Sequence, residues 1–176
     1  MSEAIAPAVW TLAGVLALAA VAKLRDPGPA DRALGAVGMV HGRVLVRAIA
    51  TGELAIAAWC LIAPGTAAMA ALAAVYVSFA GAVSRMRQAG VSDCGCFGER
   101  SFEPGVAHLA LNLCAAAIAM VAVIVPPPGI AAVADRAPLE AVALACGVAG
   151  CVYLSYLAFT ALPKAWGSYA AAGGGR

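Results

Sequence analysis

The chain has 176 residues, of which 64% are apolar and only 11% are charged, and its formal net charge is +2. A soluble domain has about a quarter of its residues charged, so this composition excludes a soluble globular protein and indicates an integral membrane protein. The small net charge, without a basic stripe and interleaved aromatic residues, also argues against nucleic-acid binding.

Five hydrophobic segments are long enough to cross a bilayer, which takes about 20 helical residues. They cover residues 4–22, 44–63, 66–83, 106–125 and 139–162. The sequence therefore predicts an all-α fold, a polytopic membrane bundle of four core helices with a fifth, C-terminal span. We expect a single domain over residues 1–165, and a disordered tail over residues 166–176.

The connections decide which segments share a face of the membrane. Pro64 and Gly65 predict a tight turn between the second and third spans, because proline cannot continue a helix and glycine accepts a turn. Residues 33–40 are apolar enough for a short helix in the interface. Since the first, third and fifth spans end on the same side, the loops that follow the first and third spans share one face with the C-terminal tail.

Basic residues are strongly biased toward that shared face. Of the 11 Lys and Arg residues, Arg136 alone lies on the other face; the rest are Lys23, Arg25, Arg32, Arg43, Arg47, Arg85, Arg87, Arg100, Lys164 and Arg176. The positive-inside rule places the shared face in the cytoplasm. We therefore expect a multi-pass protein of the cell (inner) membrane with this face inside.

Two cysteines on the shared face, Cys94 and Cys96, are the first candidates for chemistry. Cysteines two positions apart in a turn can form a disulfide, although a strained one, and Gly95 relieves the strain because it lacks a Cβ. A strained disulfide is easily reduced, which is typical of redox-active pairs. If the next helix begins near residue 102 or 104, its N-terminus and Arg100 would stabilise a thiolate, whereas Asp93 would oppose this effect.

Two other interpretations of the pair stay open. The thiols could bind a soft metal such as copper(I), for which His108 and the methionines are the further ligands available. Alternatively, they are two small residues in a turn with no chemical role.

Three polar residues within the spans are further candidates. Glu53 lies near the middle of the second span, where a carboxylate must be paired or protonated. Reflection through the turn at residues 64–65 places Tyr76 and Ser78 at about its depth, so either a structural hydrogen bond or a role beside a quinone or proton path is open. His108 and Asn112 lie one turn apart and face the same way.

Three ordered motifs give the chain a resemblance to a known family. They are the run Ala22-Lys23-Leu24-Arg25-Asp26-Pro27 that closes the first span, Glu53 in the second, and the run Asp93-Cys94-Gly95-Cys96-Phe97-Gly98 after the third. Together they resemble the MauE family of methylamine-utilisation membrane proteins, grouped with the broader DoxX-like membrane proteins. The resemblance covers roughly residues 5–125 and does not include the fifth span.

This resemblance implies a membrane protein of thiol redox chemistry, with a thioredoxin-like partner and a link to maturation of the disulfide-rich methylamine dehydrogenase. It implies that Cys94 and Cys96 are the redox pair. By the same resemblance, Lys23, Arg25, Asp26 and Glu53 are motif positions of unknown role. We expect these four to support the pair together with its sequence neighbours and a histidine, namely Asp93, Gly95, Phe97, Gly98, Arg100 and His108. By analogy with oxidative folding, the pair would face away from the cytoplasm, opposite to the charge bias.

The layout is also similar, more distantly, to vitamin K epoxide reductase, which would bring a quinone cofactor. The chain departs from that pattern because one residue rather than two separates its cysteines and no second cysteine pair follows the first span. Two further function classes stay open beside thiol exchange, namely a non-catalytic membrane scaffold for assembly, and a carrier of a small solute or soft metal.

Overall fold

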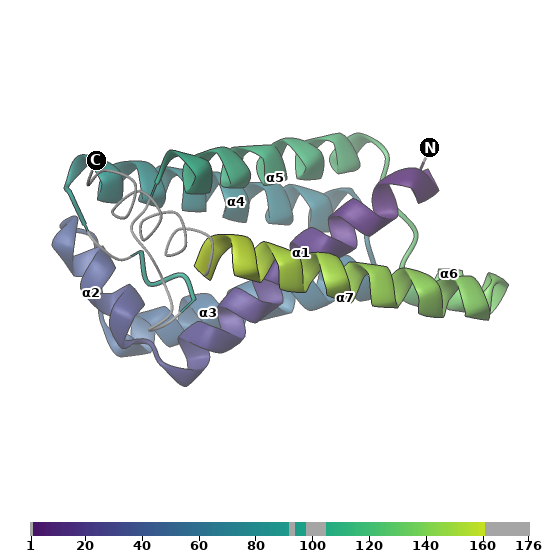
Figure 1. Ribbon diagram of the computed structural model, residues 1–176, viewed down its shortest axis with the longest axis horizontal. Helices are drawn as coiled ribbons and strands as arrows, with labels where there is room; N and C mark the ends of the chain where they lie inside the picture. The colour runs from purple at the N-terminus through teal and green to yellow at the C-terminus, as the bar shows by residue number, and fades with distance from the viewer. Residues whose placement is uncertain (1, 92–93, 98–104, 161–176) are drawn as a thin grey trace, which may run out of the picture.

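The computed structural model describes residues 2–91, 94–97 and 105–160, and every regular element within these residues is an α-helix (Figure 1). The helices are α1 (Ser2–Arg25), α2 (Gly28–Ala36), α3 (Arg43–Ile62), α4 (Thr66–Gln88), α5 (Val106–Ile124), α6 (Ile130–Arg136) and α7 (Pro138–Thr160). Five of them, α1, α3, α4, α5 and α7, are long and apolar enough to cross a membrane. The predicted all-α polytopic bundle is therefore confirmed, and the protein is a multi-pass membrane protein.

Two helices extend beyond their predicted ends, and a third is displaced. The first span continues to Arg25 rather than ending at residue 22, and α4 continues to Gln88 rather than residue 83. Long cationic side chains can reach water while their helix goes on, so the apolar run underestimates the helix. The short helix α2 spans 28–36 instead of 33–40. Proline at its first positions favours this earlier start, and Asp26 Oδ1, just before the helix, accepts a hydrogen bond from the N–H of Gly28 at 3.0 Å.

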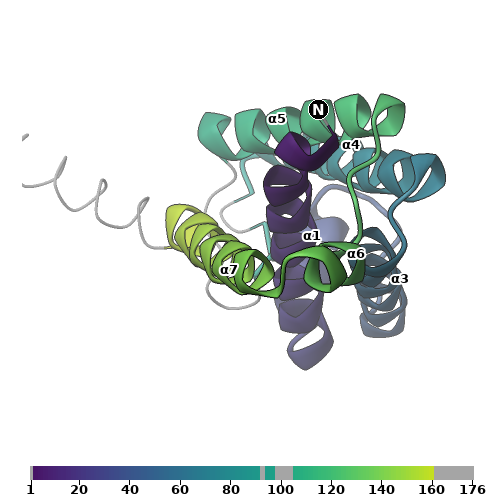
Figure 2. The same cartoon turned by 90° about the vertical axis from the view of Figure 1, so that its right-hand side faces the viewer.

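The bundle has two main helix pairs, with a third element on its outside. Helix α4 packs along α5, α1 packs along α3, and α7 lies against α1 (Figure 2). The contact of α1 with α7 is close at Gly14, where a Cβ atom would come within 2.6 Å of Val152 Cγ2. Few α7 side chains are buried, so this helix presents apolar residues to the lipid.

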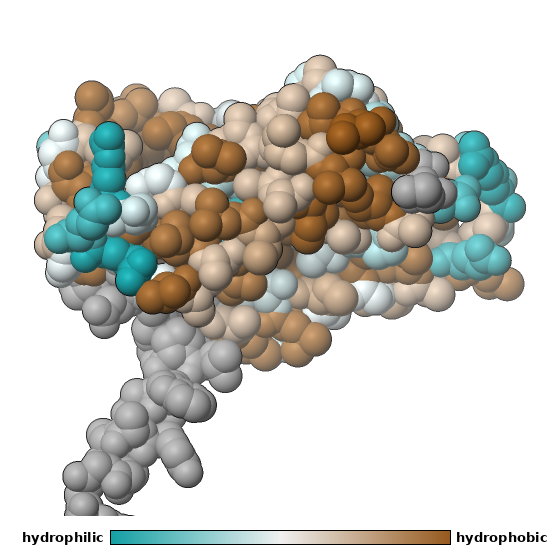
Figure 3. Space-filling view, turned by 90° about the horizontal axis from the view of Figure 1, so that it is seen from above, coloured by the Kyte–Doolittle hydropathy of each residue, from teal (hydrophilic) through white to brown (hydrophobic). Residues whose placement is uncertain are grey.

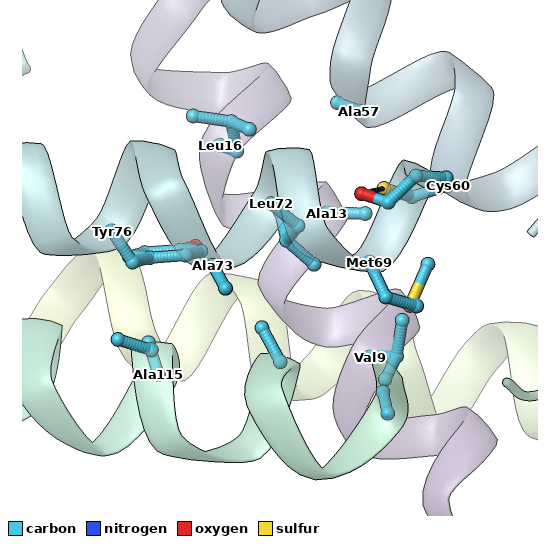
Figure 4. Packing of buried hydrophobic residues seen from close by; sticks show 14 residues of the cluster. Val9, Ala13, Leu16, Ala57, Cys60, Met69, Leu72, Ala73, Tyr76 and Ala115 are labelled. Carbon is cyan, nitrogen blue, oxygen red and sulfur yellow. Dashed lines mark hydrogen bonds between the residues drawn. The ribbon is translucent and has the colours of Figure 1, made fainter. Parts of the chain in front are cut away.

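The core depends on small side chains. Alanines from α1, α3, α4 and α5 are fully buried around a few larger residues, of which Leu16, Met69 and Leu72 have 2% or less of their surface exposed (Figure 4). Because lipid tails are as apolar as a leucine, membrane helices associate mainly through close packing. An alanine-rich interface permits that close approach.

The outer surface is arranged as a bilayer requires. Hydrophobic residues occupy the middle of the long axis and hydrophilic residues gather toward its two ends (Figure 3). At one end lie α2, the last turns of α1 and α4, and residues Cys94–Phe97, which we call the thiol loop (Figure 1). The prediction that the connection after the first span and the Cys94 loop share a face is confirmed, with α6 at the opposite end.

Candidate functional site

The thiol loop is held against the beginning of α2 by a glycine. Gly95 has a φ of +65°, and a Cβ atom built on it would lie 2.4 Å from Ala30 N and 2.6 Å from the Pro29 carbonyl carbon. Only glycine satisfies both the left-handed backbone and the close approach. The first turn of α2 is therefore the surface on which the loop rests, and Gly28, Pro29 and Ala30 are all buried there.

The two cysteines of the loop differ in exposure. Cys94 is 3% exposed and packs with Ala33 of α2 and Met86 of α4, whereas Cys96 is half-buried. Both are thiols in this structure, and the Cys96 thiol donates to the Cys94 carbonyl oxygen at 3.8 Å. Both sulfur atoms and a ring nitrogen of His108 lie within 4.8 Å of one another. The predicted pair thus converges and brings an imidazole with it.

The surroundings of Cys96 raise the pKa of its thiol. The hydrogen bond with the Cys94 side chain is the largest effect that raises the pKa of Cys96 well above its ordinary value, and burial and negative charge on Cys94 add to it. The nearby ammonium of Lys23 lowers the pKa of Cys96, and the Glu53 carboxylate raises it. These effects favour the thiol form of Cys96 over its thiolate.

Lys23 and Glu53 form a buried ion pair that joins two helices. The ammonium at the end of α1 donates to Glu53 Oε1 on α3 at 2.5 Å and also contacts Oε2. The two side chains are only 8% and 4% exposed. The ammonium also lies 4.8 Å from the centroid of the Phe79 ring, within range of a cation–π contact. Two motif positions with no assigned role are therefore direct partners.

This pairing corrects the expectation for the neighbours of Glu53. The polar groups expected at its depth on α4 bond elsewhere: the Tyr76 hydroxyl donates to Leu12 O at 2.7 Å, and Ser78 donates to Ala74 O at 2.8 Å within its own helix. The partner of the carboxylate comes from α1 instead.

A small cavity of about 30 Å³ connects the ion pair with the thiol loop. Its polar lining consists of Lys23 from α1, Tyr76 from α4, Cys96 from the loop, and His108 and Asn112 from α5. The prediction that the last two face the same way is confirmed, and the Asn112 amide additionally donates to His108 O at 2.8 Å. The cavity thus brings together polar residues from three helices and the thiol loop.

An aromatic contact links the loop to α7. Phe97 is 7% exposed, and its ring meets that of Tyr156 edge-on, with 5.8 Å between centroids and an interplanar angle of 80°. The sequence predicted no role for α7 near the thiols. The sequence signal for this contact was Tyr156 itself, because it lies toward the end of a span that returns to the face of the thiol loop.

The remaining candidates contribute less to this site. Asp26 lies just before α2 and accepts a hydrogen bond from the N–H of Gly28, and Arg25 is exposed at the end of α1. Asp93, Gly98 and Arg100 lie outside the described residues, as does the predicted helix start near residues 102–104; α5 is described from Val106. Of the other cysteines, Cys60 is buried in the core and donates to Ala68 O, whereas Cys114, Cys146 and Cys151 are exposed on the surfaces of α5 and α7.

Comparison with known proteins identifies one family. The family model for methylamine utilisation protein MauE matches residues 1–125, which contain helices α1 to α5 and the thiol loop. No curated protein and no solved structure matches the chain. The ion pair, both loop cysteines and His108 all lie within the matched residues, and α7 lies beyond them.

Proposed function

The chain belongs to the family of methylamine utilisation protein MauE, and from this premise we propose that it exchanges disulfides with a thioredoxin-like partner through Cys94 and Cys96. Membership of the family suggests a membrane protein that serves methylamine utilisation. A substrate that suits this chemistry is a disulfide-rich enzyme in maturation, such as methylamine dehydrogenase.

The convergence of the two sulfur atoms carries the proposal. They lie within 4.8 Å of each other at one end of the bundle, outside the spanning helices. Rotation of the two side chains can bring thiols at that separation to the bond length of a disulfide, about 2.05 Å. The glycine between them accepts the required backbone.

The difference in exposure between the two cysteines supports one order of the two steps. In the proposed reaction the thiolate of Cys96, the more exposed residue, attacks one sulfur of the partner's disulfide, whose other sulfur leaves as a thiolate. Cys94 then loses its proton and attacks Cys96. This step closes the Cys94–Cys96 disulfide and releases the partner as a dithiol. Two electrons pass from this protein to the partner, and the reverse sequence returns them.

The ion pair supports this reaction from the cavity wall. Attack requires a thiolate, and the ammonium of Lys23 is the group that lowers the pKa of Cys96 against the effects that raise it. Glu53 holds the ammonium in place from α3. In this proposal Lys23 is a positioning residue of the exchange, and Glu53 acts through it.

Trapping a mixed disulfide tests the exchange. The Cys94→Ala variant cannot resolve the intermediate, so it should accumulate a covalent complex with a thioredoxin-like protein that a thiol reductant releases. Cys96→Ala should form none, and Cys114→Ser, which changes an exposed cysteine on α5, should behave like the unaltered protein. If Cys94→Ala and Cys96→Ala trap equal amounts, the proposed order of the two steps is wrong. If neither variant traps any, exchange through this pair is wrong and a scaffold role takes its place.

For sidedness we propose that the thiol loop faces the cytoplasm. The basic residues at the thiol end, Lys23, Arg25, Arg32, Arg43, Arg47, Arg85 and Arg87, outnumber Arg136 at the other, and basic loops stay inside. A membrane-impermeant thiol reagent applied to intact cells should therefore spare Cys96 and label it after the cells are opened. Equal labelling before and after opening would place the loop outside, as analogy with oxidative folding predicts.

A further inference from the structure

We propose that the reduced thiol loop binds one copper(I) ion through the sulfur atoms of Cys94 and Cys96 and a ring nitrogen of His108. This inference concerns the same residues as the exchange reaction but needs no protein partner. It rests on the position of the three donors, on the chemistry of their surroundings and on the size of the cavity beside them.

The three donor atoms already have the spacing of a ligand set. Bonds from a first-row metal to thiolate and imidazole measure about 2.3 and 2.0 Å. Three such ligands in a plane around one ion are then about 3.7–4.0 Å apart. The two sulfurs and the imidazole nitrogen lie within 4.8 Å of one another, so an ion could be bound after side-chain adjustments of less than about 1 Å.

The composition of the set selects a soft ion. Thiolate and thioether ligands favour copper(I), whereas carboxylate and water suit harder cations. Next to Cys94 the side chain that packs from α4 is Met86, a thioether. The carboxylate of Glu53, whose charge acts on Cys96, is engaged by Lys23. Zinc is usually bound by four ligands in a tetrahedron, but the described residues gather three such donors here. Copper(I) is commonly bound by two or three ligands.

The charge around the donors also suits a monovalent ion. Two thiolates and one copper(I) leave a single negative charge, and the ammonium of Lys23 lines the same cavity as Cys96 and His108. A buried charge needs a partner of this kind close by. The cavity of about 30 Å³ holds roughly one water-sized group, so there is little room for the hydration shell that a hard cation would keep.

Copper binding and disulfide formation exclude each other, because both use the same two sulfur atoms. The ion would bind the dithiol and be released when the loop is oxidised. A disulfide offers no thiolate ligands. Oxidation of the loop therefore removes the copper(I) site and requires no change in the helices.

The test is an anaerobic competition between the purified, fully reduced protein and a chromogenic copper(I) chelator. We expect one copper(I) per chain. Loss of a second-shell partner already lowers metal affinity about 10-fold to 100-fold, so loss of a ligand in Cys94→Ser, Cys96→Ser or His108→Gln should lower the affinity by at least that factor. The matched control Cys114→Ser, on the same helix as the imidazole, should bind as the unaltered protein does. Oxidation of the unaltered protein with diamide should release the ion, which provides a comparison that does not depend on the folding of any variant.

X-ray absorption at the copper edge supplies a second readout, since it should show sulfur and nitrogen neighbours in the reduced complex. Copper retained by the Cys94→Ser/Cys96→Ser double variant, no uptake at all, or stoichiometric zinc in preference to copper(I) would each overturn the proposal. These results are distinguishable from failure of the exchange reaction. If the protein traps no mixed disulfide but binds copper(I), only the proposed function is wrong. If it traps a partner but binds no copper, only this inference is wrong.

Discussion

Substitution of Gly95 by alanine should release the thiol loop from α2. The new Cβ would lie 2.4 Å from Ala30 N and 2.6 Å from the carbonyl carbon of Pro29, and these are backbone atoms that no side-chain rotation can move. Such overpacking costs about 1–3 kcal/mol. The left-handed backbone, with φ of +65°, adds about 1–2 kcal/mol for a residue with a Cβ. We expect the loop to relieve the collision and the backbone strain by moving away from α2.

Gly90 provides a matched control for this substitution. Its φ is +66°, almost the same as that of Gly95, but a Cβ there would meet nothing within 4 Å. Gly90→Ala therefore carries the backbone cost without the collision, and the two variants should differ by about 1–3 kcal/mol in the free energy of local opening. Since each 1.4 kcal/mol is a factor of ten, the difference is about 5-fold to 150-fold in rate.

The rate of alkylation of Cys94 reports that opening, because its side chain is 3% exposed and reacts mainly when the loop moves. The reduced, chelator-treated protein is alkylated in detergent, and the fraction modified is followed with time by mass spectrometry of the Cys94 peptide. Gly95→Ala should be alkylated faster than Gly90→Ala by the factor above. Equal rates in the two variants would refute the reasoning, since they would mean that the approach of the loop to Ala30 has no energetic consequence.

Two further predictions concern the ion pair and the thiol that it faces. Lys23→Met leaves the Glu53 carboxylate buried without its partner and should lower the free energy of unfolding by about 3–5 kcal/mol. The control Glu3→Gln breaks the pair with Arg136, in which more than two thirds of each side chain is exposed, and should not change the free energy of unfolding measurably. Unfolding in mixed detergent micelles compares the two variants. Because the pKa of Cys96 is raised, its alkylation should still accelerate with pH above pH 9 in chelator-treated protein. Cys94→Ala removes the largest cause and should move the alkylation profile to lower pH, whereas an unchanged profile would show that the hydrogen bond between the two thiols has no such effect.

The fold could be predicted from the sequence because bilayer insertion constrains it so strongly. Long apolar runs can only be spanning helices when every backbone polar group must be satisfied internally, and the number and order of the spans follow. The helix ends could not be predicted as well. Apolar content underestimated α4, since Arg85 and Arg87 continue the helix with their charged groups directed to water. For α2, the start signal was Asp26 followed by proline at the first positions, whereas apolar content pointed several residues too late.

The site could be predicted only in part. The cysteine pair follows from two thiols and a glycine that are neighbours in sequence, and the common face of His108 and Asn112 follows from helical periodicity. The partner of Glu53 does not follow from any local rule. A carboxylate in a span calls for a cation, but several cations lie at the same end of the bundle, and only the packing of α1 on α3 selects Lys23.

The ion pair explains why residues from distant parts of the chain meet at the thiols. A buried pair contributes little net stability, because desolvation of two charges offsets their attraction, so its value lies in where it holds the ammonium. An unpaired lysine near the end of a span would extend toward water. Glu53 prevents this by binding Lys23 from α3, and the ammonium consequently stays on the wall of the cavity that Cys96 lines. The carboxylate in the middle of a span thus acts on the loop sulfur through the lysine that it binds, and this is the physical connection between the three sequence motifs.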